Sequence, residues 1–152
     1  MIALDINVKN EKNNYLCKIF SGVDVLQYEW EIIYEDFQFY ENGERKEKLF
    51  EIDILSGEEF LKCISRDKYY MIFVDIKAYP INSKRAEINN FKDFLESKCE
   101  IVFLCTDSGF IEFYCKDKDI LDIVYNNCID NEFENVQYRS ITDVSERNLV
   151  AW

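Results

Sequence analysis

The stretch "CEIVFLCTDSGFIEFYCKDKD" (residues 99–119) predicts a β-hairpin from which the rest of the fold can be inferred. Two apolar, β-prone runs stand on either side of the turn sequence TDSG. A three-residue loop would place Cys105 opposite Ile111 and Ile101 opposite Cys115. The two cysteines would then lie roughly 13 Å apart along the strands, whereas the Cα atoms of a disulfide lie within about 7 Å. The hairpin therefore makes both cysteines small buried hydrophobic residues.

Further strands are predicted from alternating or continuous apolar residues. "YYMIFVDI" (69–76) is apolar on both faces, which is typical of a central strand, and we expect it beside the hairpin. "YEWEIIYEDFQFY" alternates and then shifts parity near Glu35-Asp36, which indicates a bulge or turn. Asn42-Gly43 is a pair that a type I′ hairpin turn prefers. The predicted strands are 2–8, 28–41 with that break, 44–50, 69–76, 101–105, 110–115 and a last one within "ENVQYRSI" (134–141).

Helices are predicted where apolar residues recur at helical spacing. The clearest lies in "SGEEFLKCIS", where Ser56 and Glu59 form a capping box and Phe60, Leu61 and Ile64 face inward. The predicted helices are 12–21, 57–66, 84–97 and 118–128, the last capped by Asp117. Together these elements predict a single α+β domain over 1–152, with a mainly antiparallel or mixed sheet of six to seven strands and three to four packed helices.

The chain is strongly acidic. Its 152 residues include 30 Asp and Glu against 18 Lys and Arg, which gives a formal net charge of −12. Such a field repels phosphate backbones and anionic lipid, so we expect neither nucleic acid nor a membrane surface as a partner. A basic protein is a suitable partner. The simpler alternative is that the acidity only keeps a chain rich in Phe and Tyr in solution.

The N-terminus and the hydropathy pattern predict a cytoplasmic protein. "MIALDINVKNEKNN" has no basic segment followed by an apolar one, as a secretory signal would have. No apolar run approaches the ~18 residues that a membrane helix needs. Because cytosolic thiols stay reduced, all six cysteines are expected to be free.

Several kinds of chemistry lack the residues they need. The sequence has no histidine, which excludes Ser-His and Cys-His nucleophile pairs and histidine metal ligands. The six cysteines have no short paired spacing, so a zinc site made of four of them is not expected. The four glycines are isolated, and neither a phosphate-binding loop nor a dinucleotide fingerprint can be built from them. We therefore expect no cofactor, no bound metal and no catalytic residue.

The stretch "FVDIKAYP" contains the one arrangement of residues in the sequence that is compatible with an enzyme. Asp75 and Lys77 share a face of a strand that leaves an apolar run. Many metal-dependent nucleases hold Mg²⁺ with such an acid-x-Lys pair and a second acid, which here would be Asp53 or Asp67. However, enzymes that cut DNA need a basic track, and this chain is acidic. The alternative is that the pair is a solvated strand end.

Two surfaces are candidates for binding a partner. Asp119, Asp122 and Asn126 have the spacing i, i+3, i+7 and would form one face of the helix 118–128, where a basic partner could dock. The alternative is an ordinary solvent-facing side of an amphipathic helix. Tyr28 and Trp30 are of the types favoured as binding anchors, but their alternation with glutamates favours a place in the core.

Three stretches of the sequence resemble a known family. "DKYYMIFVDIKAYP", "CEIVFLCTDSGFIEFYCKDKDILDIVYNN" and the closing "RNLVAW" are similar to an uncharacterised family of small proteins from low-GC Gram-positive bacteria, domain-of-unknown-function family 2691. The resemblance runs through most of the chain, most clearly from Lys68 onward. It implies a small bacterial cytosolic protein and supplies no activity, cofactor or catalytic residue.

The sequence as a whole favours a non-enzymatic binding protein that acts on a basic protein partner, a class that includes immunity and inhibitor proteins. This hypothesis depends on the small size, the acidity and the missing catalytic residue types. The alternative hypothesis is a metal-dependent enzyme that uses Asp75 and Lys77.

Overall fold

The computed structural model describes residues 1–151, which form eight strands, five α-helices and one 3₁₀ helix. In chain order these are β1 (Ala3–Asn7), α1 (Tyr15–Ile19), η1 (Val25–Gln27), β2 (Tyr28–Glu41), β3 (Glu44–Lys46), β4 (Ile54–Ser56), α2 (Gly57–Ile64), β5 (Tyr70–Pro80), α3 (Phe91–Glu96), β6 (Ile101–Thr106), β7 (Phe110–Cys115), α4 (Lys118–Asp130), β8 (Glu134–Arg139) and α5 (Ile141–Val144). None of the helices in this part of the chain is long and apolar enough to cross a membrane.

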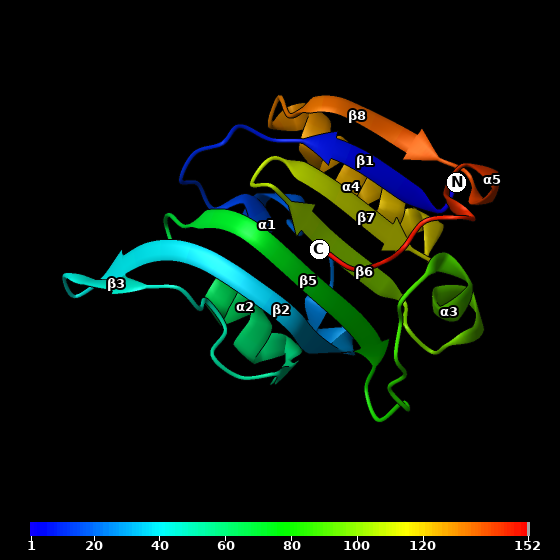
Figure 1. The fold of residues 1–152 in the computed structure, drawn as a ribbon, viewed down its shortest axis with the longest axis horizontal. Helices are drawn as coiled ribbons and strands as arrows, with labels where there is room; N and C mark the ends of the chain where they lie inside the picture. The colour runs from blue at the N-terminus through cyan, green and yellow to red at the C-terminus, as the bar shows by residue number, and fades with distance from the viewer. Residues whose placement is uncertain (152) are drawn as a thin grey trace.

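All eight strands belong to one antiparallel sheet (Figure 1). The strand order is β3-β2-β5-β6-β7-β1-β8, and β4 also pairs with β2. This confirms the predicted α+β class with its antiparallel sheet. The strand predicted at 69–76 is β5, which continues to Pro80 and lies between β2 and the cysteine-bearing hairpin.

The hairpin predicted from the cysteine stretch is formed by β6 and β7. Ile101 pairs with Cys115, and Cys105 pairs with Ile111, which is the register that the three-residue loop required. Both cysteines are fully buried. All six cysteines are free, as predicted.

β2 is one long strand rather than two short ones. Its register against β5 shifts twice, and the second bulge lies between Asp36 and Phe37, where the sequence predicted a change of parity. Asn42 and Gly43 follow the strand with φ angles of 52° and 79°. Positive φ at both central residues is what a type I′ turn requires, so the predicted hairpin turn is confirmed. The strand predicted at 44–50 is shorter than expected, because β3 ends at Lys46.

Two apolar cores lie on opposite faces of the sheet. α1, α2 and α4 cover one face (Figure 1), and the larger core beneath them includes Tyr28 and Trp30, as predicted. Trp30 stacks on Phe60 of α2 with ring centroids 3.8 Å apart, and its indole N–H donates to the Val25 carbonyl at 3.0 Å. α3, α5 and the C-terminal segment cover part of the other face, over a smaller core.

Two helices are shorter than the sequence pattern predicted. The predicted helix 12–21 is reduced to α1, because Asn13 forms an isolated β-bridge with Tyr69. The predicted helix 84–97 is reduced to α3, because the chain before Asn90 is not helical and the Asn90 side chain caps the helix. Tertiary contacts outside the helices override the local periodicity in both places.

The capping box of α2 is formed as predicted. Ser56 Oγ accepts a hydrogen bond from the Glu59 N–H at 3.2 Å, and Glu59 Oε1 accepts one from the Ser56 N–H at 3.0 Å. The prediction that Leu61 is buried is wrong, since it is 44% exposed. The helix turns Phe60 and Ile64, four residues apart, toward the sheet and leaves Leu61 beside that face.

Candidate functional site

Asp75 and Lys77, the candidate enzyme residues, form a buried ion pair on β5. Their side chains are 0% and 1% exposed, and Lys77 Nζ contacts Asp75 Oδ1. The same ammonium donates to the carbonyl oxygen of Leu149 at 2.7 Å. Leu149 belongs to the C-terminal segment that crosses this face of the sheet (Figure 1). The pair is therefore not a solvated strand end. The Lys77 ammonium anchors the C-terminal segment to the sheet through its hydrogen bond to Leu149.

The surroundings of Asp75 do not bring a set of metal ligands together. Burial raises the pKa of Asp75, while the Lys77 ammonium and the backbone of Ala151 oppose that shift. The two acids considered as its partner, Asp53 and Asp67, are both exposed, whereas Asp75 is buried. Residues 1–151 contain no group of three or more His, Cys, Asp or Glu side chains that could hold a metal ion. Lys77 also lines a small pocket of about 210 Å³, together with Ile88 and Val150.

The acidic face predicted on α4 is exposed. Asp119, Asp122 and Asn126 all lie on the solvent side of this helix. The hydroxyl of Tyr138 donates to Asp122 Oδ1 at 2.6 Å, and the Tyr138 ring stacks on Tyr125 with centroids 4.4 Å apart. One of the two carboxylates is thus held in place by β8 and keeps its negative charge.

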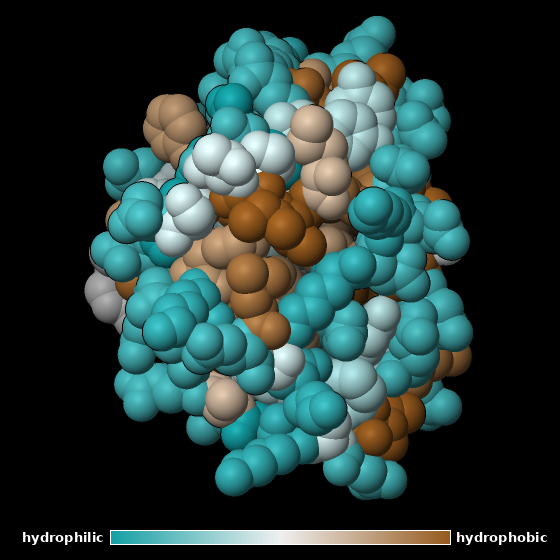
Figure 2. Space-filling view, turned by 90° about the vertical axis from the view of Figure 1, so that its right-hand side faces the viewer, coloured by the Kyte–Doolittle hydropathy of each residue, from teal (hydrophilic) through white to brown (hydrophobic). Residues whose placement is uncertain are grey.

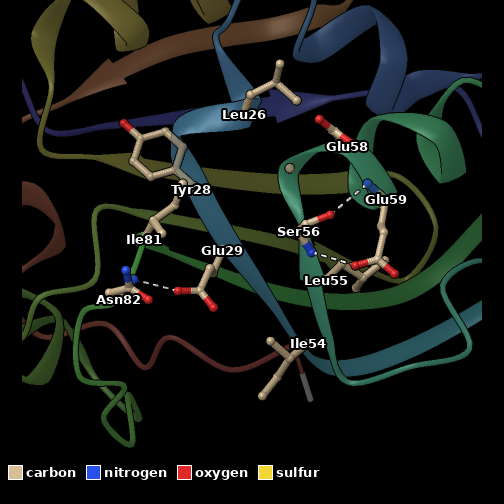
Figure 3. A pocket seen from close by; sticks show the side chains of 11 residues that line it. Leu26, Tyr28, Glu29, Ile54, Leu55, Ser56, Glu58, Glu59, Ile81 and Asn82 are labelled. Carbon is tan, nitrogen blue, oxygen red and sulfur yellow. Dashed lines mark hydrogen bonds between the residues drawn. The ribbon is translucent and has the colours of Figure 1, made fainter.

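A concave site lies elsewhere, at the end of the sheet where β2 begins and β5 ends. Figure 2 shows that exposed apolar side chains lie among mostly hydrophilic ones on this side of the molecule. A groove of about 590 Å³ is lined by residues of η1, the start of β2, the corner between β4 and α2, and the turn after β5 (Figure 3).

The groove combines an apolar lining with carboxylates. Leu26, Ile54 and Ile81 line it and are 47%, 38% and 54% exposed. Glu29 and Glu58 also line it, and no lysine or arginine is among the described residues that do so. We call this site the acidic groove. Exposed apolar side chains beside carboxylates in a concave surface make the groove a candidate binding site.

Hydrogen bonds fix two of the carboxylates around the acidic groove. Glu29 Oε1 accepts from the backbone N–H of Asn82 at 2.7 Å, which holds the turn after β5 against β2 (Figure 3). Glu59 is held by the capping box with Ser56. Glu58 is exposed in the first turn of α2. Backbone N–H groups therefore hold the carboxylates of Glu29 and Glu59 in fixed positions.

Gly57 allows the wall of the acidic groove to form. A Cβ at this position would lie 2.4 Å from both the Leu26 Cα and the Val25 carbonyl oxygen, which is closer than such atoms can approach. The start of α2 therefore packs directly on η1, and Leu26 becomes part of the groove. The sequence pattern predicted the cap at Ser56 but not the groove, because three segments far apart in the chain build it.

The buried cysteines are not activated for nucleophilic chemistry. Burial raises the pKa values of Cys99, Cys105, Cys115 and Cys128 to about 12. It also raises the pKa of Cys63. A thiol with such a pKa is protonated at neutral pH and is a poor nucleophile.

The fold and the groove define a small α+β protein with a carboxylate-lined apolar site at one end of its sheet. The family model described as Protein of unknown function (DUF2691) matches residues 1–150, and the chain belongs to this family, which confirms the resemblance seen in the sequence. The chain is 32% identical over 145 residues to the "Uncharacterized protein YncE" of Bacillus subtilis (strain 168), across 95% of this chain and 94% of that protein. No solved structure matches it.

Proposed function

We propose that this protein is a non-catalytic binding protein whose acidic groove takes a basic segment of a partner protein. The observation that carries this proposal is the make-up of the groove, where Leu26, Ile54 and Ile81 lie among carboxylates without a cation. An apolar side chain of the partner would be buried on the aliphatic surface, and a neighbouring Lys or Arg would pair with Glu29 or Glu58.

The charge of the whole chain supports the same kind of partner. A net charge of −12 attracts a basic protein from a distance and speeds the encounter. The association rate should then fall steeply with salt, because the field is screened within about 8 Å at physiological ionic strength. Immunity and inhibitor proteins that cover a basic surface of their target fit this description, and six free cysteines suit a cytoplasmic setting.

A defined peptide pair tests the proposal. One labelled peptide of about ten residues alternates Lys with Leu, and its partner replaces each Lys by Glu, so the two differ only in charge. Fluorescence anisotropy should show binding of the Lys peptide, with an affinity that falls as salt is added, and no binding of the Glu peptide. Equal binding of both peptides, or binding of neither, would overturn the proposal.

Two double variants locate the contact. Glu29→Lys with Glu58→Lys alters the acidic groove, whereas Asp119→Lys with Asp122→Lys alters the α4 face by the same change in net charge. The groove variant should weaken binding of the Lys peptide about tenfold or more, which corresponds to 1.4 kcal/mol, and the α4 variant should weaken it much less. The reverse order would move the interface to α4. Thermal melts of both variants check that the fold is retained.

A further inference from the structure

A second groove continues from the acidic groove along α2. It has a volume of about 530 Å³ and shares Leu55 and Glu59 with the acidic groove. Phe50 and Ile52 line it, and Ile52 is 47% exposed. The loop that carries them is held by Glu35, whose carboxylate accepts three consecutive backbone N–H groups. A bound chain can thus pass from one groove to the other over a fixed apolar surface.

The second groove differs from the first in having two cations beside the shared Glu59. Lys62 and Arg66 line it, and we call it the basic groove. Arg66 is paired with Glu41 at 3.3 Å and lies 5.0 Å from the centroid of the Phe39 ring, so its guanidinium is held in place. Lys62 is exposed in the last turn of α2. The sign of the surface charge therefore changes along this one helix.

The distance between the two grooves sets the length of what could span them. α2 has eight residues and is about 12 Å long at 1.5 Å per residue. An extended chain covers that distance with about four residues at 3.3 Å per residue. A segment of ordinary length can therefore contact both grooves at once.

We infer that the partner segment carries its charges in two separate blocks, with Lys or Arg over the acidic groove and Asp or Glu over the basic groove. This inference rests on the proposed function and adds the charge pattern of the partner. Apolar residues between the blocks lie where the two grooves meet, at Leu55. A segment with mixed charges brings like charges together in each groove, which disfavours it.

Two peptides of identical composition test the inference. In one peptide all Lys precede an apolar centre and all Glu follow it, and in the other the Lys and Glu are interspersed. The separated peptide should bind the wild-type protein about tenfold more tightly. Equal binding of the two peptides overturns the two-block pattern but does not contradict the proposed function. This result is expected if the charged residues of α2 only stabilise the helix by complementing its dipole. If neither these peptides nor the Lys–Leu peptide bind, the proposed function fails as well.

A charge swap on α2 gives the matched variants. Glu58 and Lys62 are exposed and four residues apart on this helix. Glu58→Lys and Lys62→Glu should each weaken binding of the separated peptide. The two changes together should weaken binding further, because Glu29, Glu59 and Arg66 keep their places and each groove then contains charges of both signs. If the double variant binds the separated peptide as tightly as the wild type does, the inference is overturned.

Two cysteines provide a local readout. Cys63 lines the basic groove, whereas Cys17 lies on α1; both are free and partly exposed. The separated peptide should slow alkylation of Cys63 several-fold, because contact with the basic groove covers it, and should leave the rate at Cys17 unchanged. Equal protection of both cysteines, or of neither, contradicts occupation of the basic groove.

Discussion

Replacing Lys77 by methionine tests whether a buried ion pair anchors the C-terminal segment. The change removes the charge but keeps a long side chain, so Asp75 remains buried without its partner. Breaking a buried pair in this way costs about 3–5 kcal/mol, a large share of the ~5–15 kcal/mol by which domains are stable. For a chain of this length, about 2–4 °C of melting temperature is lost per kcal/mol, so the midpoint should fall by about 6–20 °C.

The pH dependence of the variant has a definite sign. Burial raises the pKa of Asp75, and Lys77 opposes that shift, so the Lys77→Met variant should have a still higher Asp75 pKa in the folded state. A group whose pKa is higher in the folded than in the unfolded state stabilises the fold most when it is protonated in both states. This stabilisation is lost as the pH rises through the folded-state pKa. The stability deficit should therefore be largest near neutral pH and shrink as the pH falls toward about 3.9, the ordinary aspartate pKa.

Urea denaturation across this pH range provides the measurement. Lys92→Met is the matched control, because Lys92 pairs with Glu96 at 3.9 Å while the two side chains are 79% and 67% exposed; it should cost less than about 0.5 kcal/mol. Adding Asp75→Leu to Lys77→Met should recover most of the loss, since an apolar pair often replaces a buried ion pair at no cost. A Lys77→Met variant within about 1 kcal/mol of the wild type at pH 7 would refute the anchoring role of the pair.

Three further predictions concern the groove wall and the cysteines. Gly57→Ala should destabilise the protein by about 1–3 kcal/mol in denaturant melts, although alanine favours helix, because its Cβ would collide with η1; an unchanged or higher stability would contradict that contact. Cys115→Ser should cost roughly 1–3 kcal/mol, since the hydroxyl enters an apolar site, and Cys115→Ala should cost less; a serine variant that melts like the wild type would place Cys115 at the surface. Alkylation of the unfolded, non-reduced protein should modify all six cysteines in a mass spectrum, and a lower number would reveal a disulfide.

Much of the sheet could be predicted from the sequence, because each strand carries its own signal. The hairpin of β6 and β7 shows why: its short loop fixed the register, and the register placed Cys105 and Cys115 in the core. Asn42-Gly43 fixed a second hairpin in the same way. β4 escaped prediction because three residues are too few to show a period of two.

The sites depend on contacts that no local pattern records. The sequence showed that Asp75 and Lys77 share a face, but not that Leu149, 72 positions after Lys77, covers them. The acidic groove likewise joins Leu26, Ile54 and Ile81 from segments that are distant in the chain. Local sequence patterns determine where helices and strands form, whereas the packing of distant segments in the fold decides which side chains share a surface.

Chemical-shift mapping of the isotope-labelled protein with the Lys–Leu peptide tests the central proposal most directly. If the acidic groove is the binding site, the backbone amides of Leu26, Ile54 and Ile81 and their neighbours should shift most, and the shifts should diminish as salt screens the carboxylates. The amides around Asp119 and Asp122 should move little. Shifts confined to α4, or no shifts at low salt, would contradict the assignment of the groove as the site that binds the partner.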